Sequence, residues 1–307
     1  MRYYWEKLGQ LYCLPEQGVH EKLRTHASNP LPVWLEGDIY RIYYSARDKY
    51  NRSSVGAVEV DIVKRIVVKS HLMPFFLHGE PGSFFADGVS IGNCYRVGET
   101  IYMLFMGWQA PSAGHWRGDI GRLKLESSGA LSLDSHDPYF GISAADPISL
   151  SYPWVAGSDV VGYRMWYGST VSWDAGNGEM LHVIHHAHSC DGHLWERQGL
   201  AVPFELGRIQ AFSRPTVAVA PDGSFEMWFS YRGAPGLSYR IGYAVSVDGL
   251  AWRLALDLAG IDVSESGWDS MMIEYPYVFR HRDAQYMLYN GNDYGKTGFG
   301  IAVRRSE

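Results

Sequence analysis

Cysteine is scarce in this chain, and long apolar runs and basic clusters are absent from it. Cys13, Cys94 and Cys190 show no paired spacing, which predicts free thiols and a reduced, cytoplasmic setting. No segment has the roughly 18 uninterrupted apolar residues of a membrane span, and the opening MRYYWEKLGQ lacks the apolar stretch of a secretory signal. The net charge is -6 and there is no Lys/Arg run, so we expect neither nucleic acid nor membrane as a partner.

Segments with helical periodicity are also lacking, as are the usual signatures of nucleotide binding and of Ser-His-Asp or Cys-His catalysis. The stretch HVIHHAHSC places His182, His186 and His188 on one strand face, but it matches no established metal-ligand spacing. That strand is also expected to lie away from the centre of the molecule. We therefore expect neither a metal nor another cofactor.

Aromatic residues, by contrast, are abundant. The chain has 11 Trp and 21 Tyr among its 307 residues, and 46% of its residues are hydrophobic. Such side chains bury a large area and also stack on flat ligands. The composition indicates a sizeable core and leaves aromatics over for a binding surface.

An internal repeat organises the chain. Five segments consist of a short apolar strand, a turn and an aromatic strand that ends in Ser or Gly. In four of them the separation is the same: Pro30 to Ser45, Pro153 to Gly168, Pro215 to Ser230 and Pro276 to Gly291. A third strand follows each segment: VGAVEVD, IGRLKLE, VIHHAHS, IGYAVSV and FGIAVRR. Two of these continue through an Asp-Gly turn into a fourth strand, in SCDGHLWERQ and SVDGLAWRLA.

The last repeat stops after its third strand, at FGIAVRRSE, and the N-terminal YYWEKLGQLY resembles the missing fourth strand. We therefore expect residues 3–14 to pair with residues 298–304 and close a ring, which protects exposed sheet edges. The predicted fold is an all-β, five-bladed β-propeller that forms one domain over residues 1–307. Its blades cover roughly 27–70, 87–135, 149–202, 212–257 and 273–305 plus 3–14. A pair of β-sandwiches is the alternative.

Blade geometry also predicts where a site lies. The start of each innermost strand and the end of the second strand meet on one face, where functional loops gather. The residues there include carboxylates, arginines and aromatics, which together suit a sugar. They are His26, Asn29, Arg47, Asp48, Asp87, Trp108, His115, Arg214, Tyr231, Arg232, Glu274, Asn292 and Asp293.

Three stretches resemble a known group: DGVS with the following YRVGETIYMLFMGW, SYRGAPGLSYRIGYAVSVDGLAW, and EYPYVFRHRDAQYMLYNGNDYGKTGFGIAV. They are similar to the five-bladed glycosidase-related proteins of the arabinanase, levansucrase and invertase superfamily. The resemblance implies acids at the starts of the innermost strands. Glu274-Tyr275-Pro276 is similar to the Glu-Cys-Pro triplet of the invertase branch, and Asp87 stands where the superfamily often has Asp. The chain departs from the pattern at Asn29, where Asp-Pro is expected, and at SYP in the third blade, which lacks Glu.

We interpret Asp87 and Glu274 as a catalytic carboxylate pair, one acting as acid and the other as base or nucleophile. The remaining residues of the predicted face would bind substrate hydroxyls or an anionic group. Structural roles compete with these assignments: Asp87 in a turn, Arg47 with Asp48 as a pair between blades, and Arg214 in a salt bridge. Asp146 and Asp269 are read as loop caps.

These observations predict a cytoplasmic glycoside hydrolase without a cofactor, whose substrate is a small glycoside, an anionic one if the arginines bind it. Three alternatives stay open. They are phosphorolysis, in which the arginines and His26 hold phosphate, transglycosylation, and a carbohydrate-binding propeller without activity.

Overall fold

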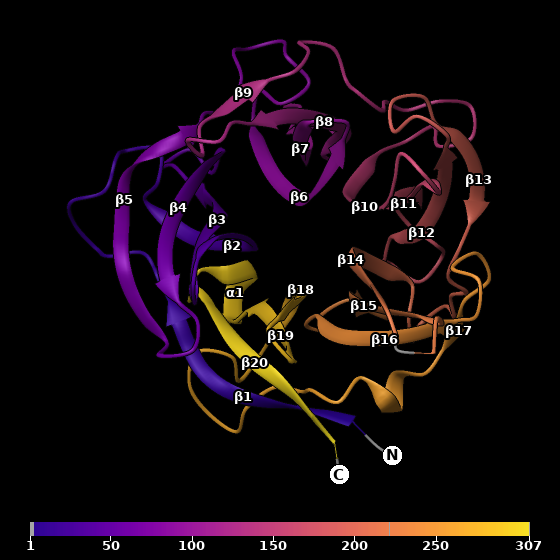
Figure 1. Cartoon of the computed structure of the whole chain (residues 1–307). Coiled ribbons are helices and arrows are strands. Elements are labelled where there is room, and N and C mark those ends of the chain that lie inside the picture. The colour runs from indigo at the N-terminus through magenta and orange to yellow at the C-terminus, as the bar shows by residue number, and fades with distance from the viewer. Residues whose placement is uncertain (1–2, 221, 307) are drawn as a thin grey trace.

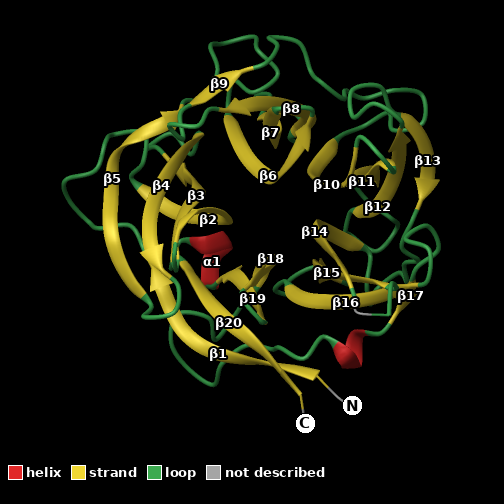
Figure 2. Ribbon diagram, viewed as in Figure 1, coloured by secondary structure: helices red, strands yellow, loops and turns green. Residues whose placement is uncertain are grey.

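The computed structural model describes residues 3–220 and 222–306, and almost all regular structure in them is β-strand (Figure 2). The two helical elements are the single 3-10 turn Leu256–Leu258 and the short α1, Asn292–Gly295. No helix in these described ranges is long and apolar enough to cross a membrane. The architecture therefore depends on strand pairing.

The strands pair antiparallel in five groups of four. The first two groups are β2 (Thr25–Glu36), β3 (Ile39–Arg47), β4 (Ser53–Asp61) and β5 (Ile66–Phe76), then β6 (Gly88–Val97), β7 (Thr100–Gln109), β8 (Arg117–Leu125) and β9 (Leu131–Leu133). The next two are β10 (Leu150–Ser158), β11 (Gly162–Ser172), β12 (Leu181–Ser189) and β13 (Glu196–Leu200), then β14 (Ala211–Val219), β15 (Phe225–Arg232), β16 (Arg240–Ser246) and β17 (Arg253–Leu254). The fifth combines β18 (Glu274–His281), β19 (Ala284–Asn290) and β20 (Phe299–Ser306) with β1 (Tyr3–Tyr12). We call these groups units 1 to 5 in that order.

The units follow one another around a common axis, as Figure 1 shows. The first strand of each unit, β2, β6, β10, β14 or β18, lies nearest the axis, and the fourth lies at the rim. This is a propeller-type arrangement, as predicted, and it brings the starts of five innermost strands together.

The two ends of the chain meet in unit 5. β1 runs antiparallel to β20, with Tyr3 opposite Ser306 and Tyr12 opposite Phe299, and both termini emerge side by side in Figure 1. The predicted pairing of the N-terminal strand with the last strand is confirmed. The outer edge of β20 is therefore covered rather than exposed.

Four of the innermost strands share a backbone irregularity at the residue just before the repeated proline. Asn29, Tyr152, Arg214 and Tyr275 each precede a proline and have positive φ angles of 55, 33, 44 and 53°. At each of these points the pairing register with the second strand shifts. A bulge of this kind redirects side chains and is common beside active sites. Because left-handed backbone is strained for residues other than glycine, the surrounding structure must hold it in place.

We expect Trp5→Ala to destabilise the protein by about 3 to 5 kcal/mol, the usual cost of emptying a buried aromatic site. Trp5 is buried on β1, packs edge-on against Trp228 at 5.5 Å and donates its backbone N–H to Gly260. Urea unfolding measures the effect. Tyr4→Ala is the matched control, because Tyr4 is on the same strand but 41% exposed. Equal stability of the two variants would contradict a structural role for the β1 closure.

Candidate active site

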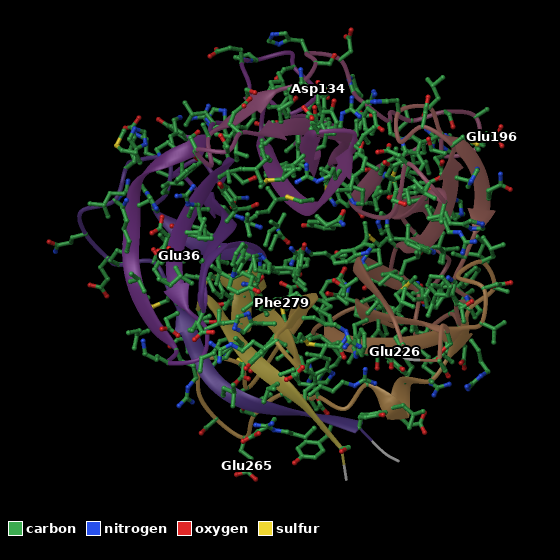
Figure 3. All side chains as sticks on the ribbon, viewed as in Figure 1. Glu36, Asp134, Glu196, Glu226, Glu265 and Phe279 are labelled. Carbon is green, nitrogen blue, oxygen red and sulfur yellow. The ribbon has the colours of Figure 1, made fainter. Side chains whose placement is uncertain are left out.

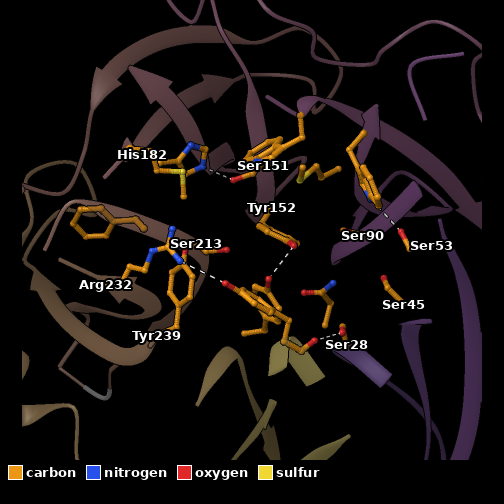
Figure 4. A pocket seen from close by; sticks show the side chains of 18 of the residues that line it. Ser28, Ser45, Ser53, Ser90, Ser151, Tyr152, His182, Ser213, Arg232 and Tyr239 are labelled. Carbon is orange, nitrogen blue, oxygen red and sulfur yellow. Dashed lines mark hydrogen bonds between the residues drawn. The ribbon is translucent and has the colours of Figure 1, made fainter. Parts of the chain in front are cut away.

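A cavity of about 540 Å³ opens where the innermost strands begin, on the face predicted from blade geometry. Such a volume is typical of small-molecule sites. Its polar floor includes Ser28, Ser90, Ser151 and Ser213, one from each of the first four units (Figure 4). Aromatic side chains form much of the wall: Trp108, Trp116, Tyr152, Trp173, Tyr239, Tyr275 and Tyr294.

Glu274 begins β18 and, unlike Asn29 and Ser213, is not among the residues that line the cavity. Its side chain is fully buried, and neither carboxyl oxygen has a hydrogen-bond partner among the described residues. Burial raises the pKa of Glu274 well above its usual range, and the positive charges of Arg47, Arg232 and Arg214 offset this only in part. Burial therefore favours the neutral form of this carboxyl group, which carries a proton that it can donate.

Two polar groups that line the cavity also lack partners. The side-chain oxygen of Asn29 and the hydroxyl of Ser213 are buried, and neither has a hydrogen-bond partner among the described residues. A buried polar group without a partner costs about 1 to 3 kcal/mol. Two such groups on one cavity indicate a polar ligand that completes their bonding.

A second carboxylate, Glu179, lines the cavity on the loop between β11 and β12. It is 4% exposed and forms an ion pair with Arg232, whose Nε lies 2.8 Å and whose Nη2 lies 2.9 Å from its oxygens. The Arg232 guanidinium also lies over Tyr239, 5.0 Å from the ring centroid. The sequence analysis missed Glu179 because it lies well beyond the end of β11, in a glycine-rich loop without periodicity. Other acidic residues, such as Asp134, Glu196 and Glu265, lie at the outer edge of the molecule (Figure 3).

Arg47, at the end of β3, lines the cavity on the side of unit 1. Its guanidinium donates to Asn51 at 2.9 Å, and no described carboxylate forms an ion pair with it. His26 lies nearby, outside the cavity lining. Burial lowers the pKa of His26 to about 4, helped by the charges of Arg47 and Lys296, so this imidazole is neutral.

Comparison with known proteins gives close relatives of unknown activity. No protein-family model matches the chain. The uncharacterized proteins MT1551 and Rv1502, from two strains of Mycobacterium tuberculosis, are each 44% identical to it over 301 residues. Those residues are 97% of this chain and 98% of each relative. The chain belongs to their family.

Solved structures share the fold at low sequence identity. A protein described as a glycoside hydrolase superposes with a TM-score of 0.71 at 14% identity, over 99% of this chain and 93% of its own. A structure from work on mannoside phosphorylases and hydrolases of family GH130 gives 0.71 at 12%, over 99% and 94%. A thermostable family-43 glycoside hydrolase gives 0.62 at 18%, over 96% and 91%. The fold is that of the propeller glycosidase-related proteins, as the resemblance in the sequence implied.

Asp87 is not among the residues that line the cavity, and its pairing with Glu274 stays a prediction. Strand register explains why Asp87 is not at the cavity. The bulge of β6 follows Ile91 and the bulge of β18 follows Glu274, so Ile91, and not Asp87, occupies the position in β6 that Glu274 occupies in β18. The Asp87 carboxylate accepts a bond from the Ala110 amide at 2.8 Å and holds the turn after β7. Trp108, which ends β7 with Gln109, does line the cavity and donates to Ser53.

Four other predicted residues also lie outside the cavity lining. Asp48 is buried in the turn after β3, where it pairs with Arg52 at 2.9 Å and accepts backbone bonds. Asn292 accepts from the amides of Met271 and Met272. Tyr231 packs beside Phe229, and Asp293 is exposed. Asp48 and Asn292 therefore support loops around the site.

Arg214 lies deeper than predicted. It is 2% exposed and does not line the cavity. Its guanidinium donates to the carbonyls of Tyr275 at 2.7 Å, Pro30 at 2.9 Å and Gly92 at 3.4 Å. These carbonyls belong to units 5, 1 and 2, so one side chain from unit 4 connects four innermost strands. Its role is structural.

We expect Arg214→Lys to lower the free energy of unfolding by about 2 to 4 kcal/mol, although the charge is kept. An ammonium group cannot match a planar fork that reaches carbonyls in three directions, and charge-assisted hydrogen bonds are worth about 1.5 to 3 kcal/mol each. Urea unfolding measures the change. Arg282→Lys, whose arginine is exposed at the end of β18, is the control. Native stability of the Arg214→Lys protein would contradict this role.

Proposed function

We propose that this protein is a glycoside-active enzyme, a hydrolase of a small soluble glycoside, and that its five units are the blades of one five-bladed propeller domain. The observation that carries the proposal is an aromatic-walled cavity lined by Asn29 and Ser213, whose buried polar atoms lack partners among the described residues, as do those of the buried Glu274. Sugars present hydroxyls at their edges and flat apolar faces, so they would satisfy both parts of this surface. The glycosidases and phosphorylases among the structures of similar fold support the same class. A cytoplasmic location stays a prediction.

Glu274 is the proton donor in this proposal. As the glycosidic carbon–oxygen bond breaks, the leaving oxygen takes the proton of the neutral carboxyl group. A carboxylic acid kept neutral by burial is suited to this step. Arg47 and Arg232, whose charges act on Glu274, would stabilise the carboxylate that forms. Asn29 and Trp108, which line the cavity, would bind the sugar.

Water is the proposed acceptor of the sugar. Its oxygen bonds to the anomeric carbon and its proton passes to the carboxylate of Glu179, the second acid at the cavity. Both acids act on Tyr239: burial raises its pKa, the charge of Arg232 lowers it, and the charges of Glu274 and Glu179 raise it further. The ion pair with Arg232 keeps the Glu179 carboxylate in place.

Phosphorolysis is the second candidate, and Arg47 favours it. Its guanidinium lines the cavity and is bound by neutral Asn51, while Glu179 is engaged by Arg232. A phosphate oxygen would then bond to the anomeric carbon in place of water and yield a sugar 1-phosphate. Arginine is well matched to phosphate because its fork binds two oxygens. Assays of glycosides with and without inorganic phosphate separate the two reactions.

We expect Glu274→Gln to lower turnover of glycosides with poor leaving groups by about 100- to 10,000-fold, the usual contribution of a general acid. Glycosides with good leaving groups should lose much less, because they need little protonation. A panel of aryl glycosides of graded leaving-group pKa, with and without phosphate, measures both.

Asp87→Asn is the matched control for that experiment. This variant makes the same acid-to-amide change at a residue that holds the turn after β7. The amide oxygen of the variant side chain still accepts from the Ala110 N–H, so we expect near-native turnover. If Glu274→Gln kept native turnover of a poor-leaving-group substrate, the assignment of the acid would be wrong. Binding of sugars without any turnover in the native protein would instead favour the non-catalytic alternative.

The raised pKa of Glu274 also predicts a pH dependence of stability. Since the folded state holds this proton more tightly than the unfolded state, the contribution of Glu274 is fully present below its unfolded pKa of about 4.3 and declines as the pH rises toward the folded pKa. Glu274→Gln removes the titration, so its stability relative to the native protein should increase between pH 5 and pH 8. Thermal unfolding at both pH values measures this. A difference independent of pH would show that Glu274 titrates normally.

A further inference from the structure

Unit 3 carries a chain of three hydrogen-bonded side chains that the proposed reaction does not use. The hydroxyl of Ser151, on β10, lies 2.6 Å from Nε2 of His182, on β12. Nδ1 of His182 lies 2.7 Å from the hydroxyl of Thr170, on β11. Ser151 and His182 line the cavity, whereas Thr170 is fully buried behind them.

The backbone is shaped to permit this contact. Gly168 lies directly opposite Ser151 in the pairing of β10 with β11. A Cβ atom at Gly168 would overlap both the Ser151 hydroxyl and Nε2 of His182. The corresponding positions in units 1 and 4 carry Ser45 and Ser230, so only unit 3 of these three leaves this space to an imidazole.

His182 is neutral in this setting. Burial lowers its pKa to about 3, with a smaller effect from His185. A neutral imidazole has one N–H and one lone pair, and each adjacent hydroxyl can donate or accept. Two tautomers therefore satisfy both ring nitrogens. In one, Ser151 donates to His182 and its oxygen can accept from a ligand; in the other, Ser151 accepts from His182 and its O–H can donate to a ligand.

The site lies apart from the Arg47 side of the cavity. Figure 4 shows Ser151 and His182 on one side of Tyr152 and Ser28 on the other. An aromatic wall stands beside the pair: the Trp116 ring is edge-on to His182 at 6.0 Å and to Trp173 at 5.0 Å. A hydroxyl-binding group next to aromatic faces is a second place for a sugar ring.

We propose that Ser151, positioned by His182 and Thr170 beside Trp116 and Trp173, binds a hydroxyl of a second sugar residue, so that the substrate is a disaccharide or a longer glycan. The inference rests on the proposed function in taking the ligand to be a carbohydrate. It goes further because it requires a second sugar residue in the substrate, joined either to the leaving group or to the sugar that is transferred. His182 is a positioning residue, because it acts through Ser151.

Binding without turnover tests the proposal. The probes are glucose, mannose and galactose, and the disaccharides maltose, cellobiose and sucrose, added to protein with 15N-labelled histidine. We expect at least one disaccharide to shift the ring-nitrogen signals of His182, which report the tautomer ratio. Ser151→Ala should raise the Kd of that disaccharide about 5- to 10-fold, the loss of one hydrogen bond, and should leave monosaccharide binding unchanged.

Thr170→Val is the second variant, since it fills the same space without a hydrogen-bonding group. It should favour the tautomer protonated on Nε2, visible in the His182 signals before any sugar is added. His186→Gln, on the same strand but outside the cavity lining, is the matched control and should bind like the native protein.

Two results would overturn the inference. One is a disaccharide that binds Ser151→Ala with native affinity, and the other is a His182 signal that no probe moves. Either can occur while Glu274→Gln still loses turnover, in which case the proposed function stands without this second site. Conversely, a disaccharide that depends on Ser151 would support the site even if Glu274 proved inactive.

Discussion

A buried cation at the axis is the interaction on which the rest of the structure depends. The innermost strands of the units must meet near the axis, although they do not pair with one another, and backbone carbonyls would otherwise face one another there. Arg214 fills this point and donates to carbonyls of units 1, 2 and 5. Burial lowers its pKa to about 10, so the guanidinium keeps its charge at neutral pH. Because these hydrogen bonds and its burial restrain the Arg214 side chain, they also fix the positions of the innermost strands beside the cavity.

The bulges before the prolines connect that axis to the cavity. At the last paired position before the bulge, units 1, 3 and 4 have Ser28, Ser151 and Ser213, while unit 5 has Glu274. A serine hydroxyl costs less to bury at this position than a carboxyl group does. The carboxyl group of Glu274 has no hydrogen-bond partner among the described residues, and its burial raises its pKa well above the usual range. In our proposal the same backbone position therefore serves for binding in three units and for chemistry in the fifth.

Two kinds of polar group divide the cavity between them. Arg47 of unit 1 and the ion pair of Glu179 with Arg232, from units 3 and 4, are charged, whereas Ser151, His182 and Thr170 of unit 3 form a neutral chain. Charge suits a reacting centre, where it stabilises groups that ionise during the reaction. Neutral hydroxyl and imidazole groups suit recognition, because they bind hydroxyls without the cost of stripping water from an ion.

The repeat in the amino-acid sequence by itself determined the four-stranded units, their order and the pairing of β1 with β20, because strand alternation and turn residues are local signals. It also predicted the cavity face, and Asn29, Arg47, Trp108 and Arg232 do line it. Tertiary structure alone decided the rest. The register of the bulge in β6 places Ile91, and not Asp87, at the position equivalent to Glu274. Arg214 has a positive φ, and its side chain donates to backbone carbonyls near the axis rather than lining the cavity. Glu179 and His182 came to the cavity from a loop and a third strand. Their positions depend on how whole sheets pack, since contacts between distant segments are not encoded in the pattern of either one.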